Sequence, residues 1–285
     1  MKHSGSMKCL FAAVGAAAGI AGIATYLIAP TRPTKAQKAP FWGANIAHRG
    51  LHRPDRSVPE NSIPAFAAAV EAGYGVEFDV HITADGELIV FHDDVLRRMC
   101  GVEGAVEKFT YAELRELHLA ATQEKIPLLR DVLTTVGGRT PIVLELKSGH
   151  DNRRLCELTC AELSLYHGPV CIESFDPRIL RWWRFNAPQM MRGQLSSALC
   201  SYQGRRKRLL AFAMSNLLYN CLGRPHFIAY GIYGKKPITV RLCEKMGAMR
   251  FAWTSHGPAN EQANDAVIFE YYRPRTKFKS LDEER

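Results

Sequence analysis

Short apolar runs alternate with longer amphipathic stretches along most of the chain, beginning near Phe41. Runs rich in Val, Ile and Phe are typical of strands that are buried on both faces, whereas the stretches between them have the apolar spacing of helices. This alternation predicts parallel strands joined by helical crossovers. We expect eight strands, at 44–48, 75–81, 141–147, 169–174, 191–196, 226–231, 249–254 and 265–270.

The predicted helices lie between these strands. One begins after Asn61 or Ser62, which are good N-cap residues, and Thr110 with Glu113 forms a capping box at the start of another. Further helices are expected at about 126–136, 153–166, 177–186, 205–221 and 237–246. Eight strands with crossover helices predict an α/β fold of the (β/α)8 TIM-barrel type, whose active site lies at the C-terminal ends of the strands.

The stretch GVEFDVHITADGELIVFH at 75–92 places charged side chains inside an apolar strand. Because side chains alternate across a strand, Glu77 and Asp79 share one face. Two adjacent carboxylates repel, so they are best explained by a cation between them or by protonation of one. The Asp-Gly pair predicts a tight hairpin turn, with 88–92 returning antiparallel and His92 roughly opposite Asp79.

Other ionisable residues also fall at the C-terminal ends of predicted strands. In a barrel these ends meet at one mouth, so we expect the side chains to collect there. Carboxylate oxygens are hard ligands that suit Mg²⁺ or Ca²⁺. The alternative for Glu145 and Lys147 is a simple ion pair on one strand face. The residues expected at the mouth are His48, Glu77, Asp79, Glu145 and Lys147.

Two histidines, His48 and His92, are candidates for acid–base catalysis. Breaking one P–O bond while forming another needs a group that accepts a proton and a group that donates one. A lone histidine is usually structural, whereas two histidines beside three carboxylates indicate catalysis.

The N-terminal segment at 9–30 has no charged residue and is long enough to cross a bilayer as a helix. We expect an uncleaved membrane anchor, with a cleaved signal peptide as the alternative. Basic residues on both sides leave the orientation open, and eight cysteines without a CxxC pair slightly favour a cytoplasmic catalytic domain. The expected parts are an anchor at 1–30, a linker at 31–40, a barrel at 41–274 and a charged tail at 275–285.

The formal charge of +9 suits an anionic partner, and beside an anchor the nearest one is the surface of membrane lipid headgroups. Nucleic acid is not expected, because no zinc-finger spacing, RRM-like aromatic motif or helix-turn-helix is found. The stretch at 204–225 joins a basic cluster to an apolar helix. It fits an outer barrel helix or, alternatively, a membrane contact or a lid over a lipid-like substrate. The oligomeric state stays open.

A series of short motifs follows one another along residues 41 to 274. The motifs are AHRG at 47–50, PENSIPAF at 59–66, VEFDVHITADGELIVFHDDVLRR at 76–98, IPLL at 126–129, LELK at 144–147, ESFDP at 173–177, GQL at 193–195 and FAWT at 251–254. In this order they resemble the glycerophosphodiester phosphodiesterase family. The resemblance implies a metal-dependent TIM-barrel hydrolase that converts glycerophosphodiesters to glycerol 3-phosphate and an alcohol, with lysophospholipids as the alternative substrate.

The resemblance also implies roles for single residues. The implied catalytic residues are His48 and His92. The implied ligands of a divalent metal, Mg²⁺ or Ca²⁺, are Glu77, Asp79 and Glu145. The residues implied near the substrate and its phosphate are Arg49, Glu60, Lys147, Phe175 and Trp253. The two aromatic residues are as often used for packing.

The chain departs from the family pattern near its C-terminal end. Ser255 and His256 follow the WT pair, the next helix is shortened, and Glu270 stands where an aspartate is expected. We expect His256 on the surface. Two other functions stay open: a related barrel lyase that forms cyclic phosphates, and a lipid-headgroup-binding domain without turnover. The complete HRG, PENS and LELK motifs favour the hydrolase over the lyase, and the intact histidines and carboxylates argue against a binding domain without turnover.

Overall fold

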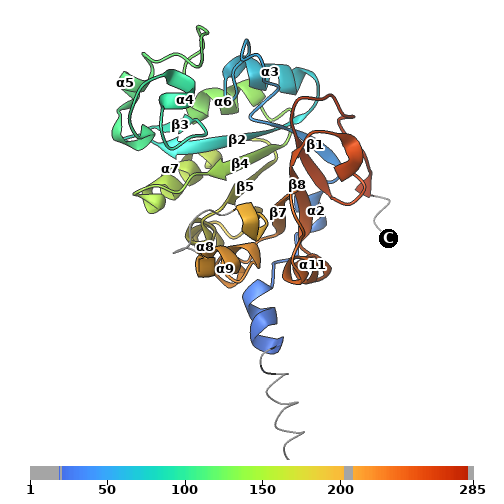
Figure 1. Cartoon of the computed structure of the whole chain (residues 1–285). Helices are drawn as coiled ribbons and strands as arrows, with labels where there is room; N and C mark the ends of the chain where they lie inside the picture. Colours follow the sequence, from blue (N-terminus) through green and yellow to red (C-terminus); the bar gives the residue numbers. More distant parts are fainter. Residues whose placement is uncertain (1–18, 20, 202–207, 282–285) are drawn as a thin grey trace, which may run out of the picture.

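The computed structural model describes residue 19 and residues 21–201 and 208–281. Within these residues, eight parallel strands close into a barrel because β1 pairs with both β2 and β9, while β3 pairs antiparallel with β2 (Figure 1). The predicted TIM barrel and hairpin are confirmed. The strands are β1 Ala44–His48, β2 Gly75–Ile82, β3 Leu88–Val90, β4 Ile142–Leu146, β5 Val170–Ser174, β6 Arg192–Ser196, β7 Phe227–Gly231, β8 Met249–Ser255 and β9 Ala266–Phe269.

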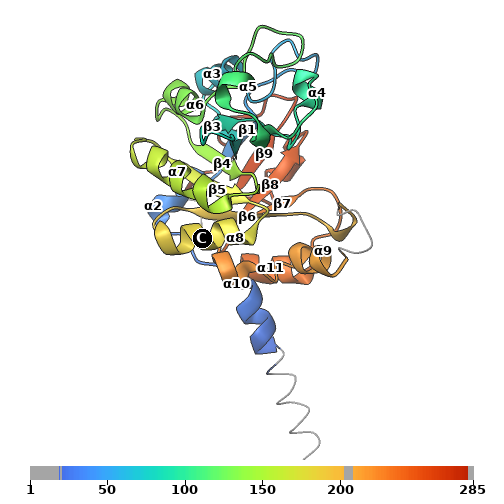
Figure 2. The same cartoon turned by 90° about the vertical axis from the view of Figure 1, so that its left-hand side faces the viewer.

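Helices surround the barrel in the stretches between the strands (Figures 1 and 2). Ser62 caps α3 by accepting a hydrogen bond from the Ala65 N–H, and Thr110 with Glu113 forms the predicted capping box of α5. The helices are α2 Lys35–Lys38, α3 Ile63–Glu71, α4 Arg97–Cys100, α5 Tyr111–Leu114, α6 Leu129–Val136, α7 Asn152–Ser164, α8 Pro177–Asn186, α9 Arg208–Ser215, α10 Asn220–Gly223 and α11 Ile238–Lys245.

Some helical predictions differ from the structure. The helix predicted to start near Thr110 ends at Leu114, because the chain then turns back and His118 pairs with Lys125 in an isolated bridge. The stretch predicted as one helix at 205–221 holds α9 and α10, and its residues 205–207 lie outside the described residues. Leu217 separates the two helices with a φ of 58°, which a right-handed helix does not allow.

Apolar residues fill both the inside of the barrel and the layer beneath the helices. Inside, the rings of Phe227 and Phe251 stack with centroids 4.1 Å apart. On the outer face, Phe78 of β2 is fully buried under the helices. Since side chains alternate along β2, the burial of Phe78 outside turns Glu77 and Asp79 into the barrel.

The N-terminal side of the described chain contacts α10. Residues 21–28 are helical, and the Arg224 guanidinium donates hydrogen bonds to the carbonyls of Tyr26 and Ala29 at 2.7 and 2.9 Å. The predicted membrane anchor falls largely on residues 1–18 and 20, which lie outside the described residues. No helix in the part of the chain that the structure describes is long and apolar enough to span a membrane.

The predicted linker and tail both contact the barrel. In the linker, Arg32 Nε donates to the Met246 carbonyl at 2.8 Å, next to the end of α11. In the tail, the Phe278 N–H donates to the Gly43 carbonyl at 2.8 Å. Lys279 forms an ion pair with Asp265 at 2.9 Å. The chain on either side of the barrel is thus held against the ends of β1, β8 and β9, while the boundaries of the parts stay predictions.

Candidate active site

The C-terminal ends of β1, β2 and β4 bring the predicted acidic residues together. Strand register places His48 beside Glu77 and Asp79 beside Glu145. Oxygen atoms from Glu77, Asp79 and Glu145 all lie within 4.8 Å of one another, and each residue is buried. The predicted convergence of side chains from neighbouring strands at one mouth is therefore present.

Two cations lie against this carboxylate cluster. Lys147 Nζ is 2.8 Å from both Asp79 Oδ1 and Glu145 Oε1, so the simple Glu145–Lys147 pair is only part of a larger network. Arg49 Nε is 3.5 Å from Asp79 Oδ2, and its Nη1 donates to Glu60 Oε1 at 2.7 Å. Glu60 is also bound by Arg98, and these guanidinium groups outweigh burial and lower the Glu60 pKa to about 2.

A fourth carboxylate, Glu173 at the end of β5, was not among the predicted ligands. Register places it beside Glu145, it is buried, and its Oε2 atom has no hydrogen-bond partner among the described residues. The signal in the sequence was its position: Glu173 lies near the C-terminal end of a predicted strand, as Glu145 does. Four buried carboxylates therefore face the two cations Arg49 and Lys147.

Burial controls the protonation of these carboxylates. Burial raises the pKa of Glu77 well above its usual value, and the neighbouring Asp79 charge adds to the rise. Burial likewise raises the pKa of Glu145 to about 7. Burial alone would raise the pKa of Asp79, but the charges of Lys147 and Arg49 hold it well below its usual value. The excess of buried oxygen ligands over positive charge fits a divalent cation such as Mg²⁺ or Ca²⁺.

His48 is held by a carboxylate, Glu270, that directly follows the last strand, β9. Its Nδ1 lies 3.1 Å from Oε1 of Glu270, and its Nε2 lies 3.9 Å from Oε2 of Glu77. The same Glu270 oxygen also contacts His52 Nε2 at 3.0 Å, a contact that the sequence did not indicate. Burial lowers the pKa of His48, and the hydrogen bond to Glu270 opposes this change. The glutamate at the position expected for aspartate therefore orients two imidazoles.

His92 lies just beyond β3 and is held in a similar way. Its Nδ1 is 2.6 Å from Asp93 Oδ1, and Arg98 Nε is 2.6 Å from the other Asp93 oxygen. Burial lowers the pKa of His92, while the nearby Asp79 carboxylate opposes this. The predicted pairing of His92 with Asp79 is wrong by one position, because the Phe91 N–H donates to the Asp79 carbonyl at 2.9 Å.

The remaining predicted residues lie around the same mouth. Phe175 and Trp253 pack edge to face with ring centroids 5.6 Å apart, and Trp253 Nε1 donates to the Ala229 carbonyl at 2.9 Å. These contacts serve packing and leave both rings partly exposed. His256 is exposed, as predicted, and stacks on Tyr271.

Gly50 is expected to be irreplaceable because it combines a φ of 78° with a close contact: a Cβ atom would lie 2.7 Å from the backbone of Ala65. Gly86 has a φ of 86° but no atom within 4 Å of such a Cβ. Gly86→Ala should cost about 1–2 kcal/mol of stability, whereas Gly50→Ala should cost about 1–3 kcal/mol more. Denaturant unfolding of both variants checks this; equal losses would contradict the account.

A closed barrel whose mouth holds buried carboxylates and two carboxylate-bound histidines defines a class of acid–base hydrolases that use a divalent metal. A profile of the Glycerophosphoryl diester phosphodiesterase family matches residues 48–269. A glycerophosphodiester phosphodiesterase from Caldanaerobacter subterraneus is 30% identical over 221 residues, or 73% of this chain and 84% of that protein. The chain belongs to this family and hydrolyses glycerophosphodiesters.

Other comparisons agree with the fold. A phosphodiesterase from Oleispira antarctica, solved with the product sn-glycerol-3-phosphate, superposes with a TM-score of 0.65 at 24% identity and covers 80% of this chain and 93% of that chain. A glycerophosphodiester phosphodiesterase from Thermotoga maritima gives a TM-score of 0.58 at 25% identity, covering 79% and 93%. A human lysophospholipase D is 31% identical over 131 residues, 41% of this chain and 40% of that protein.

Proposed function

We propose that His48 and His92 are the acid–base pair of this hydrolysis. The observation that carries the proposal is that each imidazole has its Nδ1 held by a carboxylate, His48 by Glu270 and His92 by Asp93. Such a contact fixes the tautomer and leaves Nε2 for the substrate. One Nε2 accepts the proton of the attacking hydroxyl or water, and the other protonates the departing alcohol oxygen.

We also propose Glu77, Asp79 and Glu145 as the ligands of Mg²⁺ or Ca²⁺. When bound, the ion would supply positive charge that stabilises the non-bridging phosphate oxygens. Arg49 and Lys147, which lie beside Asp79, contribute further positive charge to the same oxygens. Glu60 supports this role by holding the Arg49 guanidinium in place.

Product analysis tests the reaction. The full-length chain in detergent, given glycerophosphocholine and a divalent metal, should release choline and glycerol 3-phosphate in equal amounts, measured by phosphorus NMR and a choline assay. A reaction that stops at a cyclic phosphate would assign the lyase activity instead. Binding of glycerophosphocholine without any release would assign a headgroup-binding domain.

Lysophospholipids are the second candidate substrates. Exposed apolar side chains occupy the segments that follow β6 and β7 on the mouth side, among them Leu199 at 48% and Tyr233 at 64% exposure. Such side chains suit the acyl chain of a lipid substrate. The similarity to a human lysophospholipase D supports the same substrate class.

Tyr233→Asp should lower the rate on lysophosphatidylcholine several-fold and leave the rate on glycerophosphocholine unchanged, because only the lipid has an acyl chain to contact the rim. Leu165→Asp, at an apolar residue that follows α7 and is 79% exposed, is the control and should change neither rate. Parallel assays on both substrates check this. Equal effects of Tyr233→Asp on the two substrates would exclude the acyl contact.

We further propose that the apolar segment at 9–30 anchors the enzyme in a membrane, with the catalytic domain on the cytoplasmic side. Its support is the absence of charge over a length that suits a bilayer. Carbonate extraction of membranes tests the anchor, and protease protection in intact cells tests the side. Release of the full chain by carbonate would exclude the anchor.

A further inference from the structure

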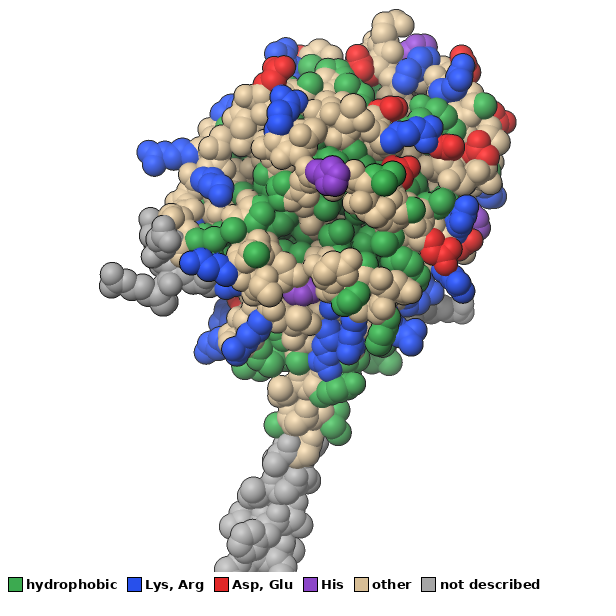
Figure 3. Space-filling view, turned by 180° about the vertical axis from the view of Figure 1, so that it is seen from behind, with side chains coloured by type: hydrophobic (Ala, Val, Ile, Leu, Met, Phe, Trp, Pro, Cys, Tyr) green, Lys and Arg blue, Asp and Glu red, His purple; other side chains and the backbone are tan. Residues whose placement is uncertain are grey.

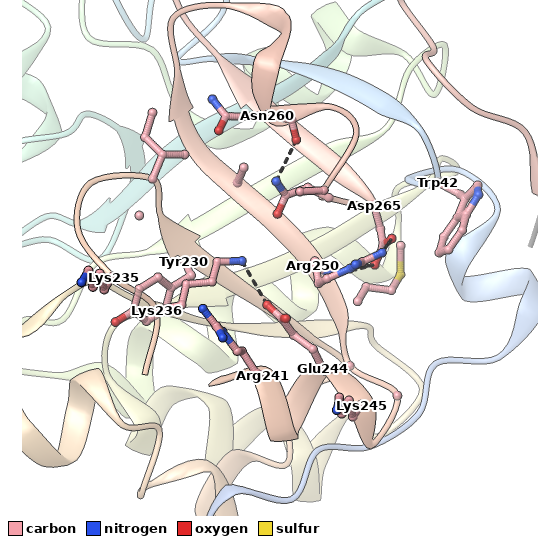
Figure 4. A pocket seen from close by; sticks show the side chains of 18 of the residues that line it. Trp42, Tyr230, Lys235, Lys236, Arg241, Glu244, Lys245, Arg250, Asn260 and Asp265 are labelled. Carbon is pink, nitrogen blue, oxygen red and sulfur yellow. Dashed lines mark hydrogen bonds and ion pairs between the residues drawn. The ribbon is translucent and has the colours of Figure 1, made fainter. Parts of the chain in front are cut away.

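The connection between β8 and β9 contains a 3₁₀ turn, Pro258–Asn260, where a TIM barrel ordinarily has a crossover helix. The outer face of β8 therefore borders a groove instead of a packed helix. The groove has a cavity volume of about 830 Å³, and its walls come from α11, the loop before α11 and the β8–β9 connection (Figure 4). This volume lies in the range of sites that bind small molecules, which is about 300–1,000 Å³.

The groove is separate from the active site. Residues of β8 alternate between the two sides of the barrel wall, so Arg250 and Ala252 line the groove while Phe251 packs in the barrel interior. The catalytic histidines and carboxylates do not line the groove. A ligand bound here would contact the protein through a different set of side chains.

Positive charge dominates the groove lining. Its two carboxylates are already paired, Glu244 with Lys236 at 3.0 Å and Asp265 with Arg250 at 2.7 Å (Figure 4). Lys38 also lines the groove, and so do three further cations, Lys235, Arg241 and Lys245. Within the described residues, none of these three side chains forms an ion pair. Cations gathered in a concave site attract an anionic ligand.

Acidic and basic residues are unevenly distributed along the chain, and the groove borders a stretch that is rich in basic residues. From residue 177 to residue 243 the sequence contains no Asp or Glu, but many Lys and Arg residues. This stretch includes α9, α10 and most of α11, which lie along one side of the barrel near the N-terminal segment (Figure 2). Figure 3 shows Lys and Arg side chains gathered at this lower end of the molecule. The groove is therefore formed in part by a stretch of chain with an excess of positive charge.

The groove also contains an unused hydrogen-bond acceptor. Asn264 lines it and is only 5% exposed. Its Nδ2 donates to the Asn260 carbonyl at 2.8 Å, while its Oδ1 has no hydrogen-bond partner among the described residues. A buried acceptor without a donor is costly, so a ligand with a hydroxyl group would be favoured here.

We propose that this groove is a second, non-catalytic site for a glycerophosphate group, in which Arg241 binds the phosphate, Lys235 and Lys245 on either side of it add positive charge, and Asn264 Oδ1 accepts a hydrogen bond from a glycerol hydroxyl. The group can come from free glycerol 3-phosphate or from the headgroup of an anionic glycerolipid. Ile238 and Leu242 of α11 expose 67% and 44% of their surface beside the groove, which suits contact with a lipid surface.

Hydrogen exchange followed by mass spectrometry locates the site in the full-length chain. Three probes are compared: glycerol 3-phosphate in detergent, nanodiscs of phosphatidylglycerol with phosphatidylcholine, and nanodiscs of phosphatidylcholine alone. Several-fold slower exchange at 234–250 is expected with the first two probes and not with the third. Protection by phosphatidylglycerol nanodiscs alone would assign a lipid headgroup; protection by glycerol 3-phosphate as well would show that the free group is sufficient.

Two charge-reversal variants distinguish binding in this groove from a general attraction of anions to a basic protein. Arg241→Glu on α11 should raise the ligand concentration that gives half-maximal protection at 234–250 by about tenfold. Arg154→Glu, at an exposed residue of α7, should leave this concentration unchanged. Both variants should hydrolyse glycerophosphocholine at the normal rate, because neither residue lies at the mouth. Absence of protection with every probe, or equal protection in Arg241→Glu, would overturn the proposal whether or not the catalytic assignment holds.

Discussion

His92→Ala is expected to lower the rate of glycerol 3-phosphate release by about 10²–10⁴-fold, the contribution of one general acid or base. The Nδ1 of His92 is held by Asp93 at 2.6 Å, so its Nε2 is the atom available for proton transfer. The proposed metal ligands and the cations beside them stay in place in this variant. The loss should therefore appear in kcat, with little change in the affinity for glycerophosphocholine.

The control is His150→Ala, which removes an exposed histidine that also contacts a carboxylate, Glu107 at 3.0 Å. This variant should keep the normal rate. Kinetics of the two variants, with binding of glycerophosphocholine measured by calorimetry, check the prediction. A His92→Ala enzyme with normal kcat, or one that loses only affinity, would remove His92 from the chemistry.

Glu77→Gln is expected to abolish metal-dependent activity and yet leave the metal-free protein as stable as the wild type or more stable. Burial and the Asp79 charge raise the pKa of Glu77, so its ionised form is disfavoured when no cation is bound. A neutral amide of similar shape removes this repulsion and also removes a proposed metal ligand. The glutamate at position 77 thus supports activity at a cost in the stability of the metal-free protein.

Thermal unfolding with and without Mg²⁺ or Ca²⁺ checks this prediction. At a metal concentration of 100 times Kd the wild type should gain about 2.7 kcal/mol, and Glu77→Gln should gain almost nothing. Glu107→Gln, which changes a carboxylate outside the mouth, should respond to metal as the wild type does. If the metal-free Glu77→Gln protein is much less stable than the wild type, the interpretation that the metal-free mouth holds an excess of buried negative charge is wrong.

The strands and the convergence of the carboxylates with His48 at the barrel mouth could be predicted from the sequence because both depend on local periodicity. Alternation along β2 alone places Glu77 and Asp79 on one face, and a parallel barrel brings the strand ends together. Glu145 and His48 then follow from their positions at strand ends. The short apolar runs bounded by turns predict the position of each strand, because a strand that is buried on both faces is apolar along its whole length.

The contacts that could not be predicted join residues far apart in the chain. The Glu270 carboxylate binds His48 and His52 across the barrel closure between β1 and β9, and no local pattern encodes that contact. The one-position difference at His92 depends on the geometry of the hairpin turn, where a shift of one residue changes every pairing. The shortened helix after β8 was visible in the sequence. The basic groove was not, because it forms only where α11 and the β8–β9 connection come together in the fold.

The most direct test of the catalytic assignment is the rate of glycerol 3-phosphate release from glycerophosphocholine by the full-length chain after treatment with a chelator and after return of Mg²⁺ or Ca²⁺. The carboxylates Glu77, Asp79 and Glu145 predict that the rate falls to background in chelator and recovers when one of these ions is restored. An undiminished rate in chelator, with the metal shown to be removed, would contradict a metal-dependent mechanism at this barrel mouth.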